Sequence, residues 1–195
     1  MYPLVYIVRH GQTEWNAERR LQGQADTVIN ALGREQATRN GIRLAEFVDN
    51  SDDFDFVASP MRRTRETMER LRAAMGLDPL AYRTDPLLVE ISFGDWQGFT
   101  FRELEARLPG STQGRRFAKW DFQPPGEGAE SYQMLLERIK PFFDALDRQT
   151  VCVTHGGVMR CLFRFVEGLS KQEAASLEIP QDRLLRLQGR TLEWL

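Results

Sequence analysis

Residues 4–11 read LVYIVRHG and residues 151–157 read VCVTHGG, and both are short apolar runs that end in a histidine and a glycine. Such a run is typical of a buried strand that delivers a polar side chain to a loop. In open parallel α/β sheets, ligands bind at the carboxyl ends of such strands. His10 and His155 are the only histidines, and their matching settings predict that they belong to one site.

The composition indicates a globular protein. The chain has 195 residues, of which 42% are hydrophobic and 28% charged, enough for one domain with a substantial core. The net charge of −2 argues against a general nucleic-acid binder. We recognise no signal peptide and no run that could span a bilayer. The two cysteines fit a reducing compartment better than a disulfide framework or a zinc site. We therefore expect a cytoplasmic protein with no membrane or nucleic-acid partner.

Strands and helices alternate along the sequence, which predicts an α/β fold. We expect strands at 4–8, 54–58, 80–84 and 151–154, and helices at 31–48, 60–75, 101–108, 131–146 and 158–166. Asn30 and Ser131 are expected to cap their helices, and Pro60 to occupy the first turn of its helix.

The domain organisation is expected to be simple. We predict one domain over 1–195, with a variable segment at about 100–130 that acts as a lid. Its part 109–129 is polar and rich in glycine and proline, and loops of that length are usually functional or disordered. The C-terminal residues predict a hairpin at the edge of the sheet, with strands at 184–187 and 191–195. The last strand offers an edge for contact in a homodimer.

Cationic and acidic groups accompany the two histidines. Arg9 precedes His10 and can form two parallel hydrogen bonds to a phosphate or carboxylate. Residues 59–67, SPMRRTRET, place further arginines at a strand-to-helix junction, where a helix N-terminus favours anions. The glycines after His155 let backbone N–H groups approach a ligand. Residues 88–98 put a carboxylate among aromatic side chains, a setting that suits a general acid.

Each of these features also has a plainer interpretation. A histidine at a strand end can be structural, and a run of arginines is commonly a solvated face. Together, however, the groups describe a pocket whose charge complements a phosphoryl group. No carboxylate cluster suited to Mg²⁺ is evident, so we expect the nucleophile to be a side chain, and histidine is an acceptable one.

The motifs resemble those of the histidine phosphatase superfamily, in its phosphoglycerate mutase-like branch, over nearly the whole chain. The matching blocks are residues 9–16 (RHGQTEWN), 19–23 (RRLQG), 59–64 (SPMRRT), 88–98 (LVEISFGDWQG) and 154–157 (THGG). The third block matches the family pattern S-P-L-x-R-A, which selects Arg63 rather than Arg62 as the phosphate ligand.

The resemblance implies a fold and a mechanism. The implied fold is a three-layer α/β/α sandwich with a mainly parallel central sheet and helices on both faces. In the implied mechanism His10 attacks phosphorus and becomes a phosphohistidine, while Arg9, Arg63 and His155 surround the transferring oxygens. Glu90 would protonate the leaving alcohol and then activate water. The implied substrate-binding residues are Asn16, Gln22, Gly23 and Gly156.

Two departures favour a phosphatase over a mutase. Gly157 stands where the family's cofactor-dependent mutases usually carry asparagine, and the long segment that those mutases insert before the second histidine is missing. Gln97 replaces the family's usual glutamate, and we expect little effect on the chemistry. We therefore expect a metal-independent phosphomonoesterase for a small phosphorylated metabolite, with no cofactor, whose site also accepts phosphate or sulfate. The alternatives are mutase-type phosphoryl transfer, a non-catalytic phospho-ligand binding protein and a metallohydrolase.

Substrate specificity in this family lies in the variable middle segment, here 102–129. That segment offers cations that could reach a second anionic group of a substrate: Arg107, Arg115, Arg116 and Lys119. Trp120 and Phe122 could instead stack on a base-like group. Alternatively, all these side chains cover the pocket or face solvent.

Overall fold

The computed structural model describes residues 1–195 and contains a six-stranded sheet with the strand order β3-β2-β4-β1-β5-β6. The strands are β1 Tyr2–Arg9, β2 Asp55–Ala58, β3 Arg83–Thr84, β4 Thr150–Thr154, β5 Leu184–Gly189 and β6 Thr191–Trp194. β1 to β4 run parallel to one another, whereas β5 and β6 form an antiparallel hairpin beside β1. The expected mainly parallel sheet and the expected edge hairpin are both confirmed.

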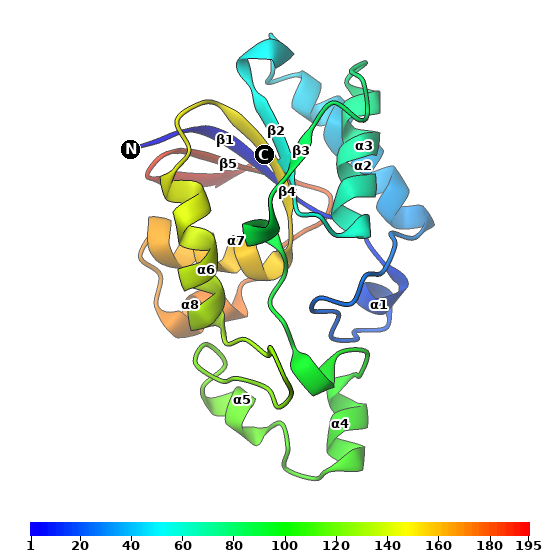
Figure 1. Ribbon diagram of the computed structural model, residues 1–195, viewed down its shortest axis with the longest axis vertical. Helices are drawn as coiled ribbons and strands as arrows, with labels where there is room; N and C mark the ends of the chain where they lie inside the picture. Colours follow the sequence, from blue (N-terminus) through cyan, green and yellow to red (C-terminus); the bar gives the residue numbers. More distant parts are fainter.

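Helices cover both faces of this sheet (Figure 1). The longer helices are α2 Ala31–Ala45, α3 Arg62–Ala74, α6 Tyr132–Asp144 and α7 Gly156–Val166. The shorter ones are α1 Glu14–Ala17, α4 Phe101–Arg107, α5 Gln113–Phe117 and α8 Lys171–Ser176, with 3-10 turns η1 Ser51–Asp53, η2 Pro86–Leu88 and η3 Gly94–Trp96. None of the helices is long and apolar enough to cross a membrane.

The alternation of side chains along β1 divides the core into two layers. Val5 and Ile7 pack in the cluster that contains residues of α6 and α7, whereas Tyr6 and Val8 pack in the cluster that contains residues of α2 and α3. Successive side chains of a strand point to opposite faces of a sheet, so a fully apolar strand needs helices on both sides. The three-layer α/β/α arrangement is therefore confirmed.

The two expected helix caps are present. The side-chain oxygen of Asn30 accepts the N–H of Gly33 at 2.9 Å, and the hydroxyl of Ser131 accepts the N–H of Met134 at 3.2 Å. The prediction for Pro60 is wrong, because α3 begins only at Arg62, after an extended residue 61. The arginines that follow are therefore closer to the helix start than expected.

The strand expected at 80–84 and the segment 109–129 also differ from the sequence-based expectation. The strand expected at 80–84 is reduced to β3, because Leu80 is exposed and Tyr82 N–H turns back to its carbonyl at 2.9 Å. Within 109–129, the short helix α5 was not expected. Its residues QGRRF have no apolar period that could reveal it.

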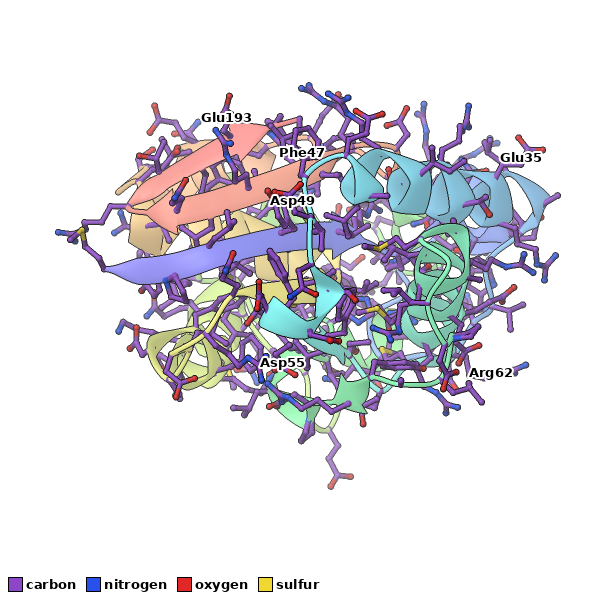
Figure 2. The ribbon with its side chains drawn as sticks, turned by 90° about the horizontal axis from the view of Figure 1, so that it is seen from above. Glu35, Phe47, Asp49, Asp55, Arg62 and Glu193 are labelled. Carbon is purple, nitrogen blue, oxygen red and sulfur yellow. The ribbon has the colours of Figure 1, made fainter.

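The segment 100–130 and the hairpin occupy two extremities of the molecule. α4 and α5 lie together at the bottom of Figure 1, away from the sheet. β6 is an edge strand, and Figure 2 shows Glu193 at that outer edge. A lid role for the segment and a dimer contact at the edge stay predictions.

Candidate active site

The carboxyl ends of β1 and β4 bring the two histidines together. The strands pair in parallel with Arg9 opposite Thr154, and the N–H of His10 donates to the carbonyl of Thr154 at 2.9 Å. The imidazole rings of His10 and His155 lie edge to face with centroids 5.2 Å apart. Both are buried, with exposed fractions of 3% and 0%.

The hydrogen bonding of His10 identifies its free nitrogen. Nδ1 lies 2.8 Å from the carbonyl oxygen of Gly11. A carbonyl oxygen can only accept, so Nδ1 carries the proton and Nε2 carries the lone pair. Burial, and then the charges of Arg63 and Arg9, hold the pKa of His10 well below its usual value. The ring is therefore neutral at neutral pH, with Nε2 available as a nucleophile.

His155 has one bound and one unbound ring nitrogen. Nε2 lies 2.8 Å from the hydroxyl of Ser59, whereas Nδ1 is buried without a protein partner. Burial, followed by the charges of Arg63 and of the neighbouring His10, lowers the pKa of His155 well below its usual value. Its Nδ1 is thus a buried polar atom that a ligand could satisfy.

Arg9 and Arg63, like His155, each have a nitrogen that is hydrogen-bonded to the protein and a nitrogen that is not. Arg9 Nη1 donates to the carbonyl of Ile179 at 2.5 Å. Arg63 donates to the carbonyls of Ala25 at 2.8 Å and Gly23 at 2.7 Å. In both side chains Nε is buried without a partner. Burial lowers the pKa of both guanidinium groups to about 10, so both keep their charge at neutral pH. We call Arg9, His10, Arg63 and His155 the histidine–arginine cluster.

Only one arginine at the start of α3 reaches this cluster. Arg63 is fully buried, whereas Arg62 and Arg65 are exposed. Figure 2 shows Arg62 on the outer side of the helix. The motif-based choice of Arg63 over Arg62 agrees with these positions.

Glu90 is held beside the cluster by backbone N–H groups. Its Oε2 accepts the N–H of Gly157 at 3.0 Å and its Oε1 accepts the N–H of Ile91 at 2.9 Å. Its negative charge acts to raise the pKa of Arg9 and Arg63, against the larger lowering by burial. A Cβ atom on Gly157 would lie 2.1 Å from Oε1. Only glycine at position 157 therefore leaves the carboxylate where it is.

Asn16 and Gln22 each have a side-chain carbonyl that is already engaged. Asn16 Oδ1 accepts from the N–H and hydroxyl of Thr13, both at 3.2 Å, and from the amide of Gln181 at 3.1 Å. Gln22 Oε1 accepts from the hydroxyl of Thr27 at 2.8 Å. In each case the protein orients the amide so that its NH2 group remains for a ligand.

The two glycines expected to bind substrate differ in position. Gly23 supplies its carbonyl to Arg63, and thus orients a side chain of the cluster. Gly156 opens α7, where the first backbone N–H groups have no intrahelical partner. A Cβ on Gly156 would lie 3.4 Å from Arg9 Nε, so its backbone faces the cluster.

Several residues that hold the cluster were missed from the sequence. Gln181 donates to the carbonyl of His10 at 3.0 Å, and Ile179 contributes a carbonyl to Arg9. Arg138 on α6 donates to the carbonyls of Leu87, Val89 and Glu90 and so fixes the loop that carries the Glu90 carboxylate. Contacts to backbone carbonyls leave no mark in a sequence motif, and only the polar character of Gln181 and Arg138 could have drawn notice.

The alternative in which Trp120 and Phe122 stack on a base-like group is not supported by their positions. Trp120 is 2% exposed, stacks on Tyr132 with centroids 5.4 Å apart, and donates to Gln133 at 3.1 Å. Phe122 stacks on Trp96 at 5.2 Å. Aromatic stacking within the protein occupies both rings, because each gains more burial there than at a wet surface.

Four cations of the 100–130 segment, those expected to reach a second anionic group, fall into two groups. Arg107 packs over the ring of Phe99 at 4.0 Å. Arg115, Arg116 and Lys119 line a cavity of about 590 Å³ between this segment and α8. No group of three or more His, Cys, Asp or Glu side chains is placed to hold a metal ion. The positive charges of Arg9 and Arg63 near the histidines suit an anion.

Comparison with known proteins agrees with this geometry. The family profile described as "Histidine phosphatase superfamily (branch 1)" matches residues 5–194. Phosphoglycerate mutase-like protein 4 of Arabidopsis thaliana is 34% identical over 167 residues, which cover 83% of this chain and 70% of that protein. Glucosyl-3-phosphoglycerate phosphatase of Mycobacterium tuberculosis is 34% identical over 170 residues, covering 80% and 71%.

Solved structures show the same likeness over the full chain. A mycobacterial glucosyl-3-phosphoglycerate phosphatase in complex with inorganic phosphate superposes with a TM-score of 0.72 at 28% identity, covering 99% of this chain and 94% of that one. The profile match, the relatives and the shared fold lead to one conclusion. The chain belongs to branch 1 of the histidine phosphatase superfamily, a family of enzymes.

Proposed function

We propose that this enzyme is a metal-independent phosphatase that hydrolyses a small phosphomonoester through a phosphohistidine on His10. One observation carries the proposal: Arg9 Nε, Arg63 Nε and His155 Nδ1 are all buried without a partner, in side chains that lie close to the His10 ring. A buried polar atom without a hydrogen bond destabilises a protein by about 1–3 kcal/mol. The oxygens of a phosphoryl group would satisfy all of them at once.

The first step forms the phosphoenzyme. Nε2 of His10 attacks phosphorus, and the bond from phosphorus to the ester oxygen breaks on the opposite side. Arg9, Arg63 and His155 donate to the non-bridging oxygens, where charge must be stabilised. His155 can donate through Nδ1 only if Nε2 accepts, so the hydroxyl of Ser59 donates to Nε2. Glu90 enters this step as the carboxylic acid, gives its proton to the leaving oxygen and becomes the carboxylate.

The second step releases phosphate. Glu90, now a carboxylate, removes a proton from water, and the water oxygen attacks phosphorus. The phosphorus–nitrogen bond breaks and its electron pair returns to Nε2 of His10. Each oxygen of Glu90 accepts only one backbone N–H, so one oxygen can also carry the proton for the leaving alcohol in the first step and accept a proton from water in the second.

Mutase-type transfer is the nearest alternative, because relatives with both kinds of name resemble this chain. The fit between Gly157 and the Glu90 carboxylate favours hydrolysis, since it keeps a base beside the phosphohistidine. Incubation with 3-phosphoglycerate and a trace of 2,3-bisphosphoglycerate separates the two reactions. Isomer exchange that is faster than phosphate release would contradict the phosphatase proposal.

The direct test measures phosphate release from a panel of phosphomonoesters in the presence of EDTA. We expect full activity of the wild-type enzyme and a loss on the order of 10⁴-fold in His10→Ala, because the nucleophile is removed. Loss of activity in EDTA that returns with a divalent metal would support the metallohydrolase alternative. Tight binding of phosphate without turnover would support a non-catalytic phospho-ligand binding protein.

A further inference from the structure

One arginine uses all of its hydrogen-bond donors around the loop that carries Glu90. Arg138 lies on α6, and its guanidinium makes five hydrogen bonds, as many as its N–H groups allow. Two of them go to the carboxylate of Glu130, at 2.7 and 2.9 Å. The other three go to the carbonyls of Leu87, Val89 and Glu90, at 2.8, 3.0 and 3.2 Å. Arg138 therefore holds the loop up to and including Glu90.

Glu130 holds the same loop on the other side of Glu90. It directly precedes Ser131, the cap of α6. Its Oε2 accepts the N–H of Ser92 at 2.9 Å as well as a hydrogen bond from Arg138, and its own N–H donates to the carbonyl of Ser92 at 2.9 Å. We call Arg138 and Glu130 the brace pair. Together they fix the backbone before Glu90, at Glu90 and two residues after it.

The loop depends on such side chains because it has no regular secondary structure of its own. Residues 89–93 belong to no helix and no strand, so their backbone groups need partners elsewhere. Besides the brace pair, the amide of Gln24 donates to the carbonyl of Glu90 at 3.0 Å. The side chains of Arg138 and Glu130 are only 22% and 14% exposed. Their two-point contact is geometrically specific, so it sets where the loop lies.

The place of the Glu90 carboxyl group matters most when the leaving group needs a proton. Proton transfer requires the donor to be within hydrogen-bond reach of the leaving oxygen, and an error of about 1 Å can cost about 10²-fold in rate. An alkoxide is strongly basic and leaves poorly without a proton. p-Nitrophenolate is weakly basic and leaves as the anion. The placement of Glu90 should therefore control the phosphorylation of His10 by alkyl esters and hardly affect that by p-nitrophenyl phosphate.

We propose that Arg138 and Glu130 are positioning residues for the proton donor Glu90, so that the enzyme's rate on alkyl phosphomonoesters depends on the brace pair. Neither side chain contacts the histidine–arginine cluster. Both act through the backbone of the loop, which carries the Glu90 carboxyl group to its contact with the N–H of Gly157. The inference rests on the proposed phosphatase function and adds the residues that place its general acid.

The test compares glycerol 3-phosphate with p-nitrophenyl phosphate in Glu130→Gln. The amide that replaces the carboxylate places an NH2 group against a donor of Arg138 or Ser92. We expect kcat/KM to fall about tenfold for the alkyl ester and less than about twofold for the aryl ester. Glu137→Gln is the matched control, because Glu137 is an exposed glutamate of α6 that accepts from Gln133, and it should change neither value. Equal losses on both esters in Glu130→Gln would overturn the proposal.

Variants of the other partner separate the brace pair from Glu90 itself. Arg138→Met should lower kcat/KM for the alkyl ester about tenfold to a hundredfold, and Arg138→Lys, with fewer donors, should restore part of it. In a Glu90→Gln background Arg138→Met should add little. If Glu90→Gln alone loses selectively on the alkyl ester but neither brace variant does, only the brace is overturned. If Glu90→Gln shows no such selectivity, the proposed proton donor is wrong and the positioning role falls with it.

Amide hydrogen exchange reports the position of the carboxyl group without turnover. The N–H of Gly157 donates to Glu90 Oε2 at 3.0 Å, so it should exchange at least about fivefold faster in Glu130→Gln than in Glu137→Gln. Nuclear magnetic resonance of the free enzyme measures both rates. Equal exchange rates would contradict the positioning role. Faster exchange in an enzyme that hydrolyses neither ester would mean that the proposed hydrolysis fails while the brace pair still places Glu90.

Discussion

The histidine–arginine cluster and the 100–130 segment are built in opposite ways. The cluster lies at the ends of central strands. In Arg9, Arg63 and His155, one side-chain nitrogen is hydrogen-bonded within the protein and another has no protein partner. The 100–130 segment consists of short helices and stacked rings, with apolar tips such as Phe117, which is 89% exposed. We propose from this difference that the chemistry depends on the rigid sheet and the choice of substrate on the 100–130 segment.

This contrast separates two kinds of substitution. A change in the cluster should alter the hydrolysis of every phosphomonoester, because all share the phosphoryl group. A change in the 100–130 segment should alter the ranking of esters and leave a minimal substrate nearly unaffected. p-Nitrophenyl phosphate, which has no second acidic group, serves as that minimal substrate.

The largest effect is expected from Arg63→Gln compared with Arg62→Gln. The first removes a buried cation from the phosphoryl site and should lower kcat/KM about 10²- to 10³-fold, as for other groups that stabilise transition-state charge. The second changes a neighbouring exposed arginine and should have an effect of less than about twofold. Steady-state kinetics on p-nitrophenyl phosphate checks both. Equal losses would mean that kcat/KM depends on the total positive charge at the start of α3, and not on the position of the Arg63 side chain.

A smaller loss is expected from Gly157→Ala. The added methyl would lie 2.1 Å from Glu90 Oε1, so the carboxylate must move and kcat should fall about tenfold to a hundredfold. The control is the same change in a Glu90→Gln background. There we expect little further loss, because residues that act as one unit are not additive. Additive losses would show that Gly157 acts on something other than Glu90.

The pH dependence should show the lowered pKa of His10. The reactive form of the His10 ring is the neutral one. Because the pKa of His10 lies well below 6.5, the ring stays neutral while the pH falls through 6.5. After correction for the second ionisation of the ester, kcat/KM at pH 5.5 should not fall below about half of its value at pH 7. A histidine with the usual pKa of about 6.5 would lose about tenfold. An acid limb centred near pH 6.5 would contradict the account.

The smallest effect is expected from Phe117→Ser at the exposed tip of α5. Surface substitutions usually change stability by about 0.5 kcal/mol or less. We expect the melting temperature and the rate on p-nitrophenyl phosphate to be almost unchanged. A large loss of activity on p-nitrophenyl phosphate would mean that the 100–130 segment takes part in the chemistry. That result would contradict the proposed division between the cluster and the segment.

The same contrast explains which features were predictable from the sequence. The strand ends with His10 and His155 were predictable, because apolar runs and glycines specify them locally. The burial of Trp120 against Tyr132 of α6 could not be predicted, because the polar segment around Trp120 gives no sign of this packing. Contacts such as Ile179 with Arg9 were missed, because a backbone carbonyl carries no side-chain signal and the two residues are far apart in the chain.

Rapid-quench mass spectrometry of the wild-type enzyme during turnover measures whether the histidine–arginine cluster transfers the phosphoryl group to His10. We predict an acid-labile, alkali-stable phosphoryl group on Nε2 of His10 that forms and decays fast enough to account for kcat. Turnover without a phosphorylated enzyme, or with phosphate on another residue, would contradict the account.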